Sequence, residues 1–126
     1  MTLSTIGILA AGGAMGAILR YAVSRGIALK WPTLEFPAAT LLVNLVGSAL
    51  LGALFAHHTP PIDHAIDDTL LLFAGVGFCG AFTTFSSFCT DTVGLLSSSM
   101  TAAALYFLAT VAGSLGAFAL FFSMVG

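Results

Sequence analysis

The sequence predicts an all-α membrane protein with four transmembrane helices, the third of which is broken near its middle. Hydrophobic residues make up 59% of the 126 residues, charged residues make up only 6%, and the mean hydropathy is +1.10. A soluble domain typically carries about 25% charged residues. This length holds four spans of about 20 residues and little else. We therefore expect one transmembrane domain over residues 1–126, placed in the inner (plasma) membrane of the cell.

Each span is expected from an apolar run and from the residues that flank it. The first run contains closely spaced small residues, including Gly12 and Gly16, which allow another helix to approach. The only plainly hydrophilic stretch is 57–68, so four spans place both termini on the side of this loop. The runs cover about 5–23, 37–56, 69 onward and 100–124.

The third run is expected to unwind within the membrane. Gly75, Gly77 and Gly80 lie close together and are followed by Thr83-Thr84. Glycine and β-branched threonine are weak helix formers. Unwound backbone at membrane depth is tolerated only where it is buried in protein or lines a cavity. A second helical piece is expected over about 85–96, followed by a turn at 97–99.

Charges are too few to support most soluble functions. Only Arg20, Arg25 and Lys30 are fixed positive charges, so no basic patch exists for nucleic acid. These residues give a weak positive-inside bias, and such a chain can insert in either orientation. Asp91 is expected near the end of the third span, at the interface. An exporter driven by protons needs a carboxylate at mid-membrane, and none is expected here.

Asn44 is a polar residue in the middle of the second apolar run. An amide in hydrocarbon must find a partner because no water is present there. It is either a functional residue or a helix–helix contact that bonds to a neighbouring span. Arg20 has two similar interpretations, as a side chain that reaches the interface or as part of a functional pathway.

Aromatic rings and hydroxyls alternate in the third span. Phe85 and Phe88 lie three residues apart and share a helical face. Each hydroxyl between and before them can donate one hydrogen bond, and a ring edge is electropositive, so the set could line a path for a small anion. Ordinary aromatic packing is the alternative, with the hydroxyls bonded to carbonyls one turn earlier. The hydroxyls belong to Thr83, Thr84, Ser86 and Ser87.

The fourth run carries a polar stripe. Tyr106, Thr110 and Ser114 are spaced four residues apart on a helix otherwise made of Ala, Leu, Phe and Gly. Such a stripe either packs against another helix or lines water.

No pattern of catalytic or metal-binding residues is found. The histidines and aspartates of 57–68 match no metal-binding motif, and Cys79 and Cys89 match neither a metal spacing nor a disulfide framework. No Ser-His-Asp pattern indicates nucleophilic catalysis. We therefore do not expect an enzyme.

Three motifs together resemble the Fluc (CrcB) family of fluoride channels. The resemblance covers the whole chain in length, in its four spans and in the order of the motifs, and the third motif is the most specific. The motifs lie at 13–21 (GAMGAILRY), 42–47 (LVNLVG) and 77–88 (GFCGAFTTFSSF).

The resemblance implies a passive channel that exports fluoride and relieves its toxicity. Family members are antiparallel homodimers with dual topology, and both subunits line each of two pores. A sodium ion at the dimer centre would be held by the backbone carbonyls of Gly80 and Thr83. The fluoride pathway implied here comprises Asn44, Phe85 and Phe88, with Ser86, Ser87, Thr84, Tyr106, Ser114 and Arg20.

One departure from the family pattern is visible, and other functions remain open from the residues alone. The family often has Gly-Leu where this chain has Ala81-Phe82, which places a third aromatic beside the pore pair.

A small dual-topology drug exporter and a non-transporting assembly subunit are the alternatives. Membrane lipid and fluoride are the expected partners.

Overall fold

The computed structural model describes residues 2–57 and 69–125, and every described element is helical. Four stretches of this part of the chain are long and apolar enough to cross a membrane, and the third is bent, as predicted. The elements are α1 (Leu3–Lys30), α2 (Ala38–His57), η2 (Leu71–Cys79), α3 (Gly80–Phe82), α4 (Phe85–Ser98) and α5 (Met100–Val125).

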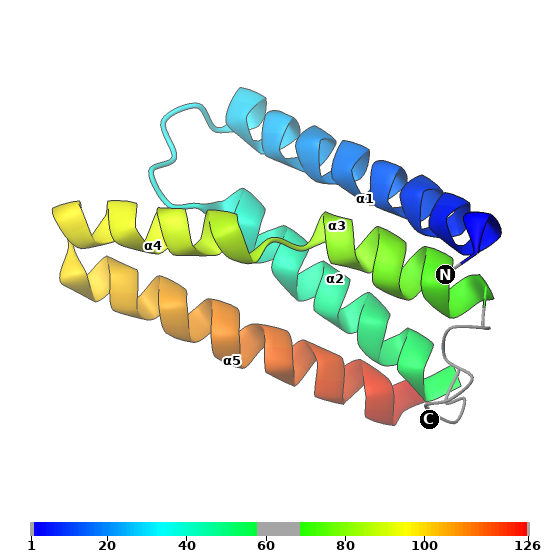
Figure 1. Ribbon diagram of the computed structural model, residues 1–126. Helices are drawn as coiled ribbons and strands as arrows, with labels where there is room; N and C mark the ends of the chain where they lie inside the picture. The colour runs from blue at the N-terminus through cyan, green and yellow to red at the C-terminus, as the bar shows by residue number, and fades with distance from the viewer. Residues whose placement is uncertain (1, 58–68, 126) are drawn as a thin grey trace.

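The helices run so that both ends of the described chain lie at one end of the bundle (Figure 1). The connection from α1 to α2 and the turn from α4 to α5 lie at the other end. Among the described elements, α2 packs most extensively against α5, and α1 against η2. Both α2 and α5 begin at the end that holds the α1–α2 connection and run toward the end that holds the termini. They are therefore parallel neighbours.

The first helix is longer than the apolar run that predicted it. α1 has 28 residues and continues to Lys30 rather than ending near residue 23. At 1.5 Å per residue it is about 42 Å long, more than the hydrocarbon thickness of about 30 Å. Arg20 therefore lies ten residues before the helix end, and the Lys30 ammonium group lies 4.9 Å from the centre of the Trp31 ring.

Small residues bring the helix axes together, as predicted for α1. A methyl group on Gly12 would collide with the Phe73 carbonyl of η2, and one on Gly16 with the Phe78 carbonyl. On α2, Gly52 meets the Phe118 carbonyl of α5 in the same way. Membrane helices gain their packing energy from such close backbone approach, because lipid offers no hydrophobic driving force between them.

The break in the third span falls on two threonines rather than on the glycines. Gly75 and Gly77 stay helical within η2, which is wound as a wider π-helix, and Gly80 begins the short α3. The backbone becomes extended only at Thr83 (φ −81°, ψ 161°) and Thr84 (φ −149°, ψ 121°). α4 then begins at Phe85, where the second helical piece was predicted, and continues to Ser98.

Candidate functional site

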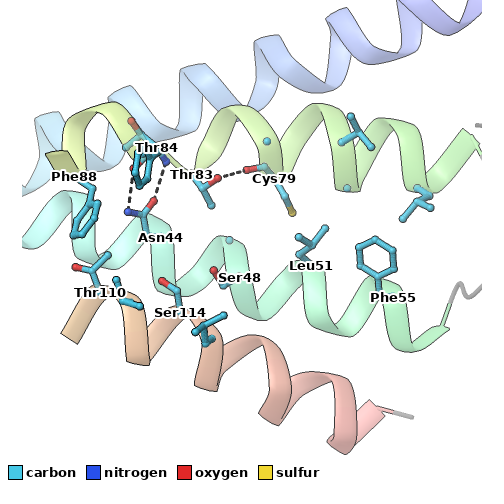
Figure 2. A pocket seen from close by; sticks show the side chains of 18 of the residues that line it. Asn44, Ser48, Leu51, Phe55, Cys79, Thr83, Thr84, Phe88, Thr110 and Ser114 are labelled. Carbon is cyan, nitrogen blue, oxygen red and sulfur yellow. Dashed lines mark hydrogen bonds between the residues drawn. The ribbon is translucent and has the colours of Figure 1, made fainter. Parts of the chain in front are cut away.

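The Asn44 side chain holds the break open by bonding to the backbone of Thr84. The Thr84 amide donates to Asn44 Oδ1 over 2.8 Å, and Asn44 Nδ2 donates to the Thr84 carbonyl over 3.1 Å (Figure 2). Asn44 is only 8% exposed. It is therefore a contact between spans, and it satisfies both backbone groups of an unwound residue. An amide nitrogen carries two N–H groups, so one donor remains beyond the bond to Thr84.

Two threonine hydroxyls form hydrogen bonds with the backbone on either side of the break. Thr84 Oγ1 accepts from the Ser87 amide over 3.2 Å and caps α4 in the way that threonine commonly does. Thr83 Oγ1 donates to the Cys79 carbonyl over 2.9 Å, which is the local bond that the packing interpretation predicted.

These bonds redirect two amides away from their usual acceptors. A continuous helix would send the Thr84 amide to the Gly80 carbonyl and the Ser87 amide to the Thr83 carbonyl. Both amides donate to side-chain oxygens instead. The Gly80 and Thr83 carbonyls are therefore among the acceptors that the break leaves without their regular donors, together with the carbonyls between them. Gly80 and Thr83 supply the two carbonyls that the sequence resemblance assigns to a cation.

A glycine on α2 makes room for the break. A methyl group on Gly47 would collide with Thr83 Cγ2 and would lie 3.4 Å from Phe82 Cδ1. Phe82 is 4% exposed and stacks on Phe78, with ring centroids 5.6 Å apart. The third aromatic of the motif thus packs against α2 and η2, outside the pocket described next.

A pocket of about 810 Å³ lies beside the break, between the third span, α2 and α5 (Figure 2). Its polar side chains come from three different spans, and most of its remaining lining is apolar. Asn44, Thr84, Phe85, Phe88, Ser114, Gly80 and Thr83 are sequence-predicted residues that line it, together with Ser48 and Thr110.

Two hydroxyls on α5 are buried without a hydrogen-bond partner among the described residues. Thr110 is 5% exposed, and its Oγ1, like the Ser114 Oγ, has no such partner. A serine or threonine in a helix can bond to the carbonyl one turn earlier, but neither of these hydroxyls does so. An unpaired buried hydroxyl costs about 1–3 kcal/mol. Both residues line the pocket, which places these two members of the predicted polar stripe beside the break.

The two predicted pore phenylalanines differ in environment. Phe85 is 75% exposed, whereas Phe88 is 5% exposed, and their ring centroids lie 5.8 Å apart at 48°. Phe88 also meets Tyr106 at 5.6 Å and Phe107 at 5.5 Å. Phe85 therefore lines the pocket and also leaves most of its ring accessible to another molecule.

Tyr106 is fully buried beside the Phe88 ring and donates to Asp91 Oδ2 over 3.3 Å. Asp91, which was expected near the end of the third span, lies midway along α4 and seven residues before the span ends at Ser98. The sequence held a signal for this contact. Asp91 and Tyr106 are nearly equidistant from the turn at Ser99, so a helical hairpin places them level with each other.

Some predicted pathway residues lie elsewhere. Ser86, Ser87, Tyr106 and Arg20 are outside the pocket lining. The Ser86 carbonyl accepts from Thr90 Oγ1, and the Ser87 amide donates to the capping hydroxyl of Thr84 at the start of α4. The histidines and aspartates of 58–68 lie outside the described residues.

The fold and this pocket define a small multi-pass membrane protein with an unwound third span, in which polar groups from three spans meet within the bundle. Residues 7–122 match the family model described as "CrcB-like protein, Camphor Resistance (CrcB)". The chain belongs to this family.

Several curated proteins are similar over most of their length. The "Fluoride-specific ion channel FluC 1" of Halobacterium salinarum is 50% identical over 77% of this chain and 72% of its own. The protein of the same name from Halalkalibacterium halodurans is 42% identical over 91% of this chain and 92% of its own. The "Fluoride-specific ion channel FluC" of Gloeobacter violaceus is 45% identical over 84% of this chain and 83% of its own.

Proposed function

We propose that this protein is a fluoride-selective passive channel, a transporter rather than an enzyme, that exports fluoride and relieves its toxicity. Support comes from the family and from relatives that are named for fluoride. The observation that carries the proposal is the pocket at the break, where hydroxyls and an amide face a space within the membrane span. Fluoride is small and strongly hydrated, and a channel must replace that hydration shell with donors.

The donors in the pocket suit an anion that must leave again. Thr110 and Ser114 offer hydroxyls that bond to none of the described residues, and Asn44 keeps one N–H. The edges of Phe85 and Phe88 add weak positive potential without a fixed charge. None of the described residues that line the pocket is Lys or Arg, so passage does not require an ion pair to be broken. Conduction needs sites that bind weakly enough to release the ion.

A flux assay tests the channel. Purified protein is placed in liposomes loaded with fluoride, a potassium ionophore sets the potential, and an electrode follows external fluoride. We expect fluoride efflux without a proton or sodium gradient, and little chloride efflux. Phe85→Ile keeps bulk but removes the ring edge and lowers efflux, whereas Phe121→Ile, outside the pocket, leaves it unchanged. Efflux that needs a gradient, or equal chloride efflux, would identify a coupled exporter or an unselective pore.

The working unit is an antiparallel homodimer with dual topology. The third span leaves Val76 59% and Phe85 75% exposed, and a methyl group on Gly80 would meet nothing within 4 Å. This open strip borders the pocket, so a second copy seated on it would complete the pore wall. Three positive charges give little preference for one orientation.

Labelling in native membranes tests the topology. Thr33 is exposed in the connection between α1 and α2. With Cys79 and Cys89 replaced by alanine, Thr33→Cys should react with a membrane-impermeant thiol reagent in about half of the molecules, as equal orientations require. The rest should react only after permeabilisation. Complete labelling from one side would exclude dual topology.

A structural sodium ion at the dimer centre would be held by the carbonyls of Gly80 and Thr83. Hard cations prefer oxygen ligands, and these are the carbonyls whose usual donors turn to Asn44 and Thr84. A bound cation would satisfy them and link two broken spans. Thermal unfolding of the detergent-solubilised dimer should shift upward with sodium and not with N-methylglucamine at equal ionic strength. An identical midpoint in both salts would argue against the ion.

A further inference from the structure

Ser48 offers a polar group at the pocket beyond those that the motifs indicate. It lies one turn after Asn44 on α2 and lines the same pocket (Figure 2). Asn44 and Ser48 share a helical face because they are four residues apart. The Ser48 hydroxyl makes no hydrogen bond to any described residue. It is therefore a free donor rather than a contact between helices.

The packing of α2 on α5 places Ser48 level with Ser114. A methyl group on Gly113 would lie 2.7 Å from Leu45 Cδ2, and Gly52 meets the Phe118 carbonyl. These two contacts join residues that are 68 and 66 positions apart on parallel helices. A residue at position 48 therefore lies level with about position 115 on α5, beside Ser114.

The same register places Asn44 near Thr110, within about one turn of the helix. The polar lining of α2 and α5 thus forms two levels, one turn or about 5.4 Å apart along the helices. Asn44 and Thr110 make the first level, and Ser48 and Ser114 make the second. Beyond the second level, the lining from α2 becomes apolar, with Leu51 and Phe55.

We infer that Ser48 and Ser114 form a second binding position for a small, strongly hydrated anion, next to the position at Asn44 and Thr110. The inference rests on the proposed fluoride channel and adds Ser48 to its pathway. Thr110 and Ser114 are buried donors that find no partner in the part of the chain that the structure describes. This is the independent sign that this part of the pocket accommodates a polar ligand. An ion that moves between adjacent sites keeps donors within reach at each step.

Flux measurements on a matched set of variants test the inference. Ser48→Ala removes the hydroxyl and should lower fluoride efflux about tenfold, which corresponds to about 1.4 kcal/mol. Ser48→Thr and Ser48→Val have nearly the same shape and differ in the hydroxyl. The threonine variant should therefore conduct at least about tenfold faster than the valine variant. Ser123→Ala is the control, because its hydroxyl bonds to the Leu120 carbonyl at the exposed end of α5.

Size-exclusion chromatography of each variant confirms that the assembly is intact, and Ser48→Gly replaces any variant that fails to assemble. Equal efflux from the parent, Ser48→Ala and Ser48→Val would overturn the role of Ser48 while leaving the channel in place. Equal loss in Ser48→Thr and Ser48→Val would assign the effect to bulk and also overturn it. A parent that releases no fluoride would instead remove the proposed function, and the second binding position with it.

Discussion

Removing the amide of Asn44 should collapse the break in the third span. Asn44→Ala leaves the Thr84 N–H and carbonyl without their partners, in a site where Asn44 itself is 8% exposed. Each buried polar group left unpaired costs about 1–3 kcal/mol, so the broken geometry loses about 2–6 kcal/mol. The simplest repair returns the Thr84 amide to the Gly80 carbonyl and re-forms a continuous helix.

Even the lower figure changes the population of the broken geometry strongly. A loss of about 2 kcal/mol shifts the ratio of broken to continuous helix by roughly thirtyfold. We therefore expect fluoride efflux from liposomes to fall, by up to about thirtyfold at this lower figure, and thermal unfolding to occur at a lower temperature. Ser97→Ala is the control, because its hydroxyl bonds locally to the Gly94 carbonyl at an exposed site. An Asn44→Ala protein that unfolds and conducts like the parent would refute this role for the amide.

Two further predictions follow from the packing around the break. Gly47→Ala places a methyl group against Thr83, costs about 1–3 kcal/mol of overpacking and should lower efflux at least about tenfold. Gly94→Ala, with nothing within 4 Å, should match the parent, and equal efflux from both would contradict the steric argument. Tyr106→Phe removes the bond to Asp91 and should lower the free energy of unfolding by about 1 kcal/mol, as denaturant titration would measure. An unchanged value would mean that this bond adds no net stability.

The four spans and the broken third span were predictable because lipid imposes simple rules on the chain. A span must be long and apolar, so composition alone located the helices. An amide within a span needs a partner, so a bond from Asn44 to a neighbouring span was one of the two expectations. That the partner is the unwound Thr84 was not predicted. The close approach of α1 to η2 through Gly12 and Gly16 was predictable because small residues allow another helix to approach.

Contacts that depend on the register between spans were not predictable in the same way. Local propensity predicted unwinding within the stretch from Gly75 to Thr84 but not the residue. The extended residues are Thr83 and Thr84, where side-chain oxygens can replace backbone partners. The bond between Tyr106 and Asp91 joins two spans and was not predicted from the sequence. The level of Ser48 beside Ser114 becomes visible only from the packing of α2 on α5.

The reversal potential of the current through a planar bilayer tests the central claim most directly. With fluoride at a tenfold gradient, no gradient of protons, and sodium and chloride equal on both sides, a passive fluoride-selective channel reverses at about 59 mV, the value for one charge. The sign follows the fluoride gradient, and a superimposed pH gradient does not move it. A potential near zero, or one that follows the proton gradient, would contradict the account.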